Sequence, residues 1–228
     1  MMRVAVWYRG LSESYLKMVT QLGADAVDFG AGDAFPGVKA QGFPDLDGVL
    51  EIKRTLRSWG LQINRVTLPD ITESFMNNEP ESERELENAV KALRVFGEAG
   101  VPIARQRFGG DAMPHRTHPY RSEHRGGYLS RGEYRDWTTP LGRDRESLDT
   151  WWGRFREVYE RLVPLAEEVG VKLAIHPSDT PYPATPFDSL GFHRVIDAFP
   201  SRQVGYLYCV GTRAEAGGSS LVLDEINN

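Results

Sequence analysis

The sequence of 228 residues predicts a single α/β domain that folds as a TIM (β/α)8 barrel, with about six βα units present. Two observations predict this fold class. Apolar runs of strand length alternate with amphipathic stretches of helix length, and a glycine stands wherever such a helix runs directly into a strand. Glycine readily adopts the left-handed conformation that ends many helices, so each junction predicts a short helix-to-strand loop. The four junction glycines are Gly23, Gly60, Gly100 and Gly170.

The predicted elements can be placed in order along the chain. Six apolar runs predict strands at residues 3–8, 24–29, 61–66, 101–104, 171–175 and 204–209. Four stretches with helical periodicity predict helices at residues 13–22, 46–59, 82–99 and 148–169. The strands are apolar throughout rather than alternating, which is typical of parallel strands covered by helices.

An open, doubly wound sheet is the alternative to a barrel. Such a sheet normally has a glycine-rich phosphate loop after its first strand, but residues 9–13 contain no GxGxxG pattern. A barrel places its chemistry at the carboxyl ends of its strands. Polar residues do cluster at these ends: Asp28, Arg65, Arg105, Arg107, His176 and Cys209. A closed barrel needs two more strands, so we expect the sequence to be incomplete beyond Asn228 rather than the sheet to be open.

One long insertion, residues 109–146 after the fourth strand, interrupts the regular spacing. It contains His115, His118 and His124 together with seven arginines. Long loops in a compact domain are often functional or disordered. The segment is therefore either a solvated excursion or a basic lid or subunit contact suited to a small anionic substrate.

Composition excludes several classes of partner and location. A net charge of -5 gives no electrostatic reason to expect binding to nucleic acid or to a membrane surface. The single cysteine cannot form an intrachain disulfide, and we find neither a signal peptide nor an apolar run long enough to span a membrane. We therefore expect a cytoplasmic protein. Trp137, Trp151 and Trp152 lie near the insertion, where they form either a subunit contact of a homo-oligomer or part of the core.

Two strand ends predict a metal site. His176 follows the fifth predicted strand and Cys209, the only cysteine, ends the sixth. An imidazole and a thiolate side by side suit Mn, Fe, Co or Zn better than Ca or Mg. Taken singly, a histidine is more often structural and a cysteine more often a small buried hydrophobic residue. Cys209 as a nucleophile is a further alternative, which no neighbouring base supports.

The arginines at the strand ends are candidates for substrate binding. Arg65, Arg105 and Arg107 can bind a carboxylate, because guanidinium groups pair with carboxylates through two parallel hydrogen bonds. The alternative is that they form salt bridges with Asp28, Asp70 or Glu73 at the same edge. Asp179, in the loop after His176, is a further substrate-binding candidate, and Glu73 and Asp179 are candidates to orient the histidine.

The C-terminal third of the chain resembles the mannonate dehydratase family. Residues 162–181 resemble that family's helix, strand and His-Pro-Asp-Asp-Pro-Pro loop, and residues 205–211 resemble its next strand, which ends in Cys-x-Gly. Two segments differ: Ser178 and Thr180 replace an Asp and a Pro, and residues 104–110 replace an Asn-Phe-Met-Pro type sequence.

The resemblance implies a xylose-isomerase-like TIM barrel and a Mn²⁺ site that His176 and Cys209 share with a His and an Asp from the last two strands. Those ligands, and the family's catalytic His and Tyr, have no counterpart up to Asn228. The implied reaction is the loss of water from D-mannonate to give 2-keto-3-deoxy-D-gluconate in hexuronate (glucuronate) breakdown. The alternatives are a sugar isomerase or epimerase on the same barrel, whose members generally place a Glu at the position of His176, and a non-catalytic metal-binding paralogue.

Overall fold

Six strands form one parallel sheet in the order in which they occur along the chain. The computed structural model describes residues 2–109, 117–127, 129–135, 145–176 and 189–210, together with residues 222, 223 and 226. The strands of the sheet are β1 (Ala5–Trp7), β2 (Ala26–Asp28), β3 (Gln62–Thr67), β4 (Ile103–Arg105), β7 (Lys172–Ile175) and β8 (Val204–Tyr206).

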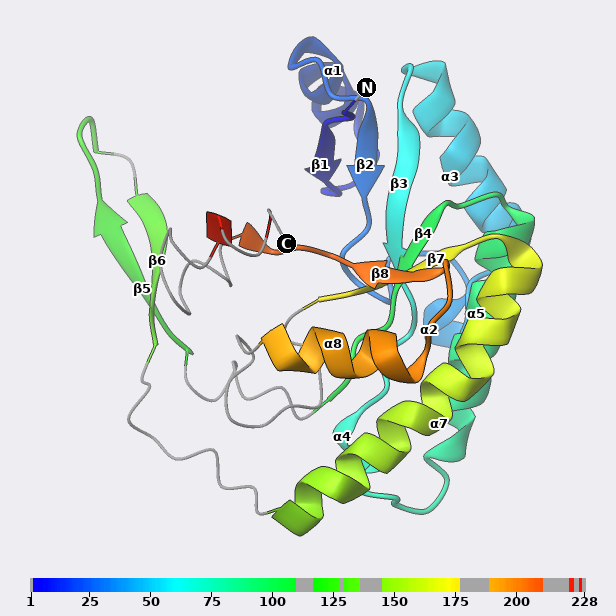
Figure 1. Ribbon diagram of the computed structural model, residues 1–228. Coiled ribbons are helices and arrows are strands. Elements are labelled where there is room, and N and C mark those ends of the chain that lie inside the picture. Colours follow the sequence, from blue (N-terminus) through cyan, green and yellow to red (C-terminus); the bar gives the residue numbers. More distant parts are fainter. Residues whose placement is uncertain are drawn as a thin grey trace.

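The strand order distinguishes between the two folds that the sequence allows. In a doubly wound sheet the order reverses partway, whereas a barrel adds each new parallel strand on the same side of the previous one. Here the order β1-β2-β3-β4-β7-β8 has no reversal, and every neighbouring pair is parallel. The described strands are therefore wound as in a barrel, as predicted (Figure 1).

Four of the longer helices occupy nearly the residues that the sequence predicts: α1 (Glu13–Gln21), α3 (Leu46–Ser58), α5 (Glu83–Glu98) and α7 (Arg145–Val169). The fifth, α8 (Ser189–Ala198), is not one of the four predicted helices, and two short ones, α2 (Val38–Gln41) and α4 (Glu73–Met76), lie in loops. The junction glycines Gly23, Gly60, Gly100 and Gly170 have φ angles of 76°, 75°, 66° and 71°, which confirms the predicted left-handed helix ends. Within the described ranges, no helix is long and apolar enough to cross a membrane.

The core lies between the sheet and its helices. Val27, Val66 and Ile175 on the strands are completely buried. Trp151 of α7 is only 4% exposed, so it belongs to the core, which was one of the two alternatives for the tryptophans. The Trp152 ring stacks on Phe155 with centroids 5.6 Å apart and is also packed against the core. Trp137 lies outside the described residues.

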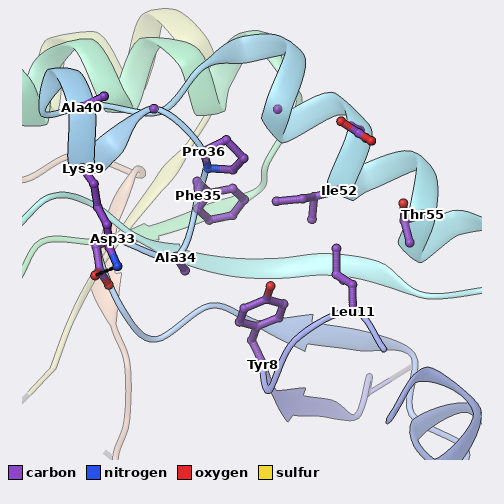
Figure 2. Close-up of a pocket in the computed structure, with 13 residues that line it drawn as sticks. Tyr8, Leu11, Asp33, Ala34, Phe35, Pro36, Lys39, Ala40, Ile52 and Thr55 are labelled. Atoms are coloured by element: carbon purple, nitrogen blue, oxygen red, sulfur yellow. Dashed lines mark ion pairs between the residues drawn. The ribbon is translucent and has the colours of Figure 1, made fainter. Parts of the chain in front are cut away.

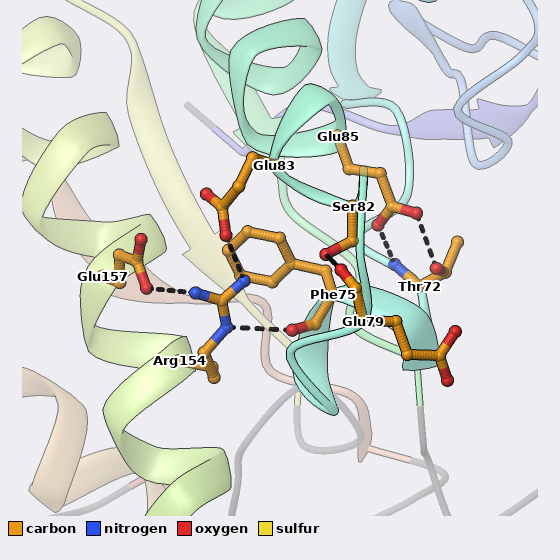
Figure 3. A network of polar contacts seen from close by, with 8 residues as sticks. All are labelled: Thr72, Phe75, Glu79, Ser82, Glu83, Glu85, Arg154 and Glu157. Carbon is orange, nitrogen blue, oxygen red and sulfur yellow. Dashed lines mark hydrogen bonds and ion pairs between the residues drawn. The ribbon is translucent and has the colours of Figure 1, made fainter.

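A polar network joins the loop after β3 to helices α5 and α7 (Figure 3). The Arg154 guanidinium donates to the Phe75 carbonyl at 2.9 Å and lies 3.7 Å from the centroid of the Phe75 ring. The same group pairs with Glu83 at 2.7 Å and with Glu157 at 2.6 Å. Because Arg154 is anchored on α7, it fixes the short helix α4 and therefore the segment that follows strand β3.

The insertion at residues 109–146 contains a β-hairpin that the sequence analysis did not predict. Strands β5 (Thr117–Glu123) and β6 (Leu129–Arg135) pair antiparallel, with Thr117 opposite Arg135. The tip turns at Gly126 and Gly127, whose φ angles are 88° and 77°. His124 is exposed at this tip, and its Nε2 lies 2.5 Å from the Ser130 hydroxyl. Figure 1 shows the hairpin standing apart from the six-stranded sheet, while His115 lies outside the described residues.

Candidate active site

The polar strand-end residues share one face of the sheet, opposite the helices. Paired residues of parallel strands point to the same side, and Trp7 pairs with Asp28, which pairs with Arg65. Thr67, two residues after Arg65 on the same strand, pairs with Arg105. The residues that alternate with these along the strands, such as Val66 and Ala104, point to the other face of the sheet and are buried under the helices. The face with the polar residues corresponds to the inside of a barrel.

A register shift between β2 and β3 places two side chains against one carboxylate. Val27 pairs with Ile63 but Asp28 pairs with Arg65, so Asn64 is an extra residue at this point. Asn64 Nδ2 donates to Asp28 Oδ1 at 2.7 Å, and Arg65 Nε donates to Asp28 Oδ2 at 3.3 Å. The Nη2 atom of Arg65 lies 3.3 Å from the same Oδ2 atom. The salt bridge between Arg65 and Asp28, one of the alternatives from the sequence, is therefore present.

Arg65 nevertheless retains hydrogen-bonding capacity. Its residue is 4% exposed, and its Nη1 atom is buried without a hydrogen-bond partner among the residues that the structure describes. Leaving a buried donor of a charged group unpaired costs about 1–3 kcal/mol or more. A ligand acceptor on the inner face of the sheet would remove that cost.

The end of strand β4 is joined to the loop after β3 by hydrogen bonds of the backbone. Ile71 N donates to the Arg107 carbonyl at 3.0 Å, and Leu68 N donates to the Arg105 carbonyl at 2.9 Å. The Arg107 guanidinium lies 3.6 Å from Asp70, and both side chains are nearly half exposed. The predicted alternative of a salt bridge is therefore also present for Arg107, although an exposed pair at this distance contributes little stability.

His176 follows β7 directly and lies within the electrostatic reach of all three arginines. Burial and the charges of Arg105, Arg65 and Arg107 lower the pKa of its imidazole from 6.5 to about 3. The ring is therefore neutral at pH 7, the form in which a histidine nitrogen can ligate a metal. The structure thus gathers four of the residues that the sequence analysis singled out around one point.

Cys209 lies near the corresponding edge, beyond the next strand. Leu207 N donates to the Ile175 carbonyl at 2.8 Å, so the pairing of β7 with β8 continues up to the residue before His176. Cys209, the single cysteine of the sequence, follows two residues later and is half-buried. Among the residues that the structure describes, no group of three or more His, Cys, Asp and Glu residues is placed to hold a metal ion. The two residues therefore supply at most part of a ligand set.

The remaining predicted site residues are less informative. Glu73 is exposed at the first position of helix α4, and Asp179 lies outside the described residues. Sequence reasoning missed Asn64, because its role depends on the register shift. It also missed the inward-facing Trp7, whose ring is so close to Gly30 that a Cβ on the glycine would lie 1.6 Å from it. The signal in the sequence was Gly30 itself, because a glycine two residues after the end of β2 indicates a point where another group approaches the backbone closely.

A separate cavity of about 550 Å³ lies on the helix-covered side of the sheet. Tyr8, Leu11, Phe35 and Ile52 contribute to its wall, and Figure 2 shows the Tyr8 hydroxyl directed toward it. Burial raises the pKa of this hydroxyl above its usual value of 10.0. Since His176 and the arginines do not line this cavity, it is distinct from the inner-face site.

Comparison with known families agrees with the winding of the sheet. A family model described as "Xylose isomerase-like TIM barrel" matches residues 16–223. The chain belongs to this family. The prediction of a xylose-isomerase-like barrel is confirmed.

The curated relatives include mannonate dehydratases. That of Streptococcus pneumoniae is 24% identical over 204 residues, which cover 74% of this chain and 55% of the relative. That of Chromohalobacter salexigens is 39% identical over a shorter stretch of 87 residues. The chain thus spans about half the length, 55%, of the Streptococcus relative.

Solved structures show the same fold. The mannonate dehydratase of Streptococcus suis serotype 2 superimposes with a TM-score of 0.70 at 21% identity, over 94% of this chain and 66% of that one. D-Psicose 3-epimerase from Clostridium cellulolyticum H10 superimposes with a TM-score of 0.54 at 13% identity, over 95% of this chain and 70% of that one. At such identities these similarities establish the fold, which different sugar enzymes share.

Proposed function

We propose that the protein is a sugar-acid dehydratase, which removes water from D-mannonate or a related sugar acid to give a 2-keto-3-deoxy acid. The observation that carries this proposal is the placement of Arg65, Arg105 and Arg107 around a neutral His176 at the carboxyl ends of the strands. Guanidinium groups are suited to hold the carboxylate of such a substrate. The similarity to mannonate dehydratases supports the same reaction class.

Dehydration of a sugar acid requires positive charge beside the substrate carboxylate, which this cluster of arginines can supply. The proton on C2, next to the carboxylate, is weakly acidic, so its removal places negative charge on the carboxylate oxygens. The electron pair left on C2 forms the C2–C3 double bond, the C3 hydroxyl leaves with a proton as water, and the resulting enol rearranges to the 2-keto acid. Fixed positive charges beside the carboxylate stabilise the charge that develops in the first step. We assign this role to the three arginines.

We further propose that His176 and Cys209 are two ligands of a Mn²⁺ ion, with other ligands from outside the described residues. Nitrogen and sulfur donors beyond the ends of adjacent strands fit a transition metal, although they form only part of a ligand set. When bound, such an ion would act as a Lewis acid toward substrate oxygens. Glu73 and Asp179 remain candidates to orient these ligands or the substrate.

The test is an assay of the purified chain with D-mannonate and Mn²⁺, followed by proton NMR. Dehydration creates a C3 methylene group, whereas epimerisation or isomerisation does not, so one spectrum separates the dehydratase from the alternative enzymes. We expect His176→Ala and Cys209→Ala each to abolish product formation and to weaken Mn²⁺ binding in a calorimetric titration. Full activity and full Mn²⁺ affinity in either variant would overturn the metal assignment. Absence of a methylene product from D-mannonate and from a panel of other sugar acids would overturn the proposed function.

A further inference from the structure

The guanidinium group of Arg65 is held by protein atoms on one side only. Its Nε and Nη2 atoms both lie 3.3 Å from Oδ2 of Asp28, whereas Nη1 is buried without a hydrogen-bond partner among the described residues. The side chain is 5% exposed. A polar network that served stability alone would leave no buried donor of a charged group unpaired, because such a donor is costly. The open Nη1 atom therefore points to a ligand that supplies the acceptor.

The carboxylate of Asp28 pairs with Arg65 in an incomplete way. An arginine and a carboxylate often form two parallel hydrogen bonds, one to each carboxylate oxygen. Here both arginine nitrogens share Oδ2, because Oδ1 accepts a hydrogen bond from Asn64 Nδ2 at 2.7 Å, a shorter contact than either of those from Arg65. Asn64 thus fixes the rotation of the carboxylate and keeps it from closing the two-bond pair.

Asn64 reaches this carboxylate only because of the register shift between β2 and β3. Val27 pairs with Ile63 and Asp28 with Arg65, so Asn64 is the additional residue. In a regular strand, neighbouring residues point to opposite faces of the sheet. The irregularity lets the adjacent side chains of Asn64 and Arg65 contact the same carboxylate, and bulges of this kind often redirect a side chain at an active site.

The Trp7 ring bounds the same guanidinium group. Its centroid lies 6.0 Å from the guanidinium carbon of Arg65, and Trp7 pairs with Asp28 in the register of β1 and β2. The ring also lies directly against Gly30, where a Cβ would be 1.6 Å away, so its position is fixed. An aromatic wall beside a buried charged donor lowers the local polarity and strengthens a hydrogen bond from that donor.

We propose that Asp28 and Asn64 are positioning residues, which together aim Nη1 of Arg65 at the substrate carboxylate. This inference rests on the sugar-acid function proposed above and assigns the direct bond to the carboxylate to Arg65. Asp28 sets the direction of the guanidinium group, and Asn64 prevents Asp28 from pairing with it through both oxygens. Both residues act through Arg65 and need no contact with the substrate themselves.

The first experiment is an NMR titration of protein labelled with ¹⁵N in its arginine side chains. EDTA is present, because Mn²⁺ would broaden the signals and permit turnover. We expect D-mannonate to shift the Nη signals of Arg65 up to saturation. D-Mannitol, which has a hydroxyl group in place of the carboxylate, should leave them unchanged. D-Glycerate, a short hydroxy acid, should cause the same shift at higher concentration. If neither acid shifts the Arg65 signals, the inference is overturned.

Variants separate positioning from a merely structural role. Arg65→Lys keeps the charge but loses the Nη1 donor, and should weaken D-mannonate binding at least about 10-fold. Asn64→Leu changes no charge at a half-buried position, and should weaken binding about 5-fold, because Asp28 can then close its pair with Arg65. Gln62→Leu is the matched control, since it removes an exposed amide from the same strand, one that accepts from Arg3, and should change affinity less than about 2-fold.

The double variant gives the decisive comparison. If Asn64 acts only through Arg65, adding Asn64→Leu to Arg65→Lys should weaken binding by less than about 2-fold further, whereas independent effects would multiply. Multiplied losses would refute the positioning role. Where Arg65→Lys does not fold, unchanged D-mannonate affinity in Asn64→Leu refutes it equally.

The dehydratase assay remains a separate measurement. Arg65 signals that shift with either acid while no methylene product forms would leave this inference standing and overturn the proposed function. Product formation with an unchanged KM for D-mannonate in Asn64→Leu would do the reverse.

Discussion

Helices α5 and α7 approach each other so closely at Gly97 that this position accepts no side chain. A Cβ added there would lie 2.4 Å from Cβ and 2.6 Å from Cγ2 of Val169. Carbon atoms pack best about 3.5–4.0 Å apart, so Gly97→Ala forces the helices apart by about 1 Å. These helices lead into β4, which ends at Arg105, and β7, which His176 follows directly, so their spacing bears on the candidate site.

The expected magnitude has two parts of opposite sign. Alanine gains about 1 kcal/mol over glycine in a helix interior, whereas overpacking at a helix contact costs about 1–3 kcal/mol. Because the clash involves the branched Cβ of Val169 rather than a flexible side-chain tip, we expect the upper part of that range and a net loss of about 1–2 kcal/mol in the free energy of unfolding. For a chain of this size, that corresponds to a fall of roughly 2–8 °C in Tm.

Gly153 in helix α7 is the matched control, because a Cβ there would meet nothing within 4 Å. Gly153→Ala should therefore stabilise the protein by about 0.5–1 kcal/mol. Urea denaturation followed by circular dichroism measures both variants against the parent protein. The reasoning is refuted if Gly97→Ala is as stable as Gly153→Ala. The contact with Val169, which only the Gly97 substitution makes, would then have no effect on stability.

Two further predictions concern His176 and Arg154. The imidazole of His176 has its ordinary pKa of 6.5 in the unfolded state and a pKa of about 3 in the folded state. Between these two pH values the unfolded state therefore binds more protons, and the free energy of unfolding rises with pH. For the metal-free protein, the free energy of unfolding measured by urea denaturation should therefore fall by about 2 kcal/mol between pH 7 and pH 5, and His176→Gln should remove most of this pH dependence. Arg154→Met should cost about 1–2 kcal/mol, because it removes the hydrogen bond to the Phe75 carbonyl and the contact of the guanidinium with the Phe75 ring, whereas Glu83 and Glu157 are 58% and 42% exposed and regain water. Arg156→Met, which breaks an exposed pair with Glu160, should cost less than about 0.5 kcal/mol by the same measurement, and similar losses in both variants would contradict this assignment.

Much of the architecture could be read from the sequence because it depends on local signals. Glycines such as Gly60 and Gly170 mark helix ends by a conformational preference that needs no tertiary information, and both adopt the predicted positive φ. The hairpin β5–β6 was not predicted because its residues do not alternate between apolar and polar types as a half-buried strand does. Its pairing is visible only once the register of Thr117 and Arg135 is known.

The position of the candidate site could also be predicted from the sequence, but its detailed contacts could not. Strand ends place Arg65, Arg105 and His176 at one edge of any parallel sheet, and the structure brings them together. The way in which Arg65 is held was not predictable, because it depends on the extra residue Asn64, which a register shift places beside Asp28. A shift of this kind reflects the packing of two strands and leaves no local pattern in either strand.

The same arginines that favour an anionic substrate oppose a bare cation. Two unit charges about 7 Å apart, at an effective dielectric constant of about 20, interact by roughly 2 kcal/mol, and the interaction doubles for a divalent ion. A metal held by His176 beside Arg65, Arg105 and Arg107 therefore gains affinity when anionic groups neutralise the guanidiniums, and by linkage the anion gains the same free energy from the metal. The electrostatics of the inner face thus couple the proposed substrate to the proposed metal: an anionic substrate would compensate the arginines and make a metal site at His176 and Cys209 more favourable.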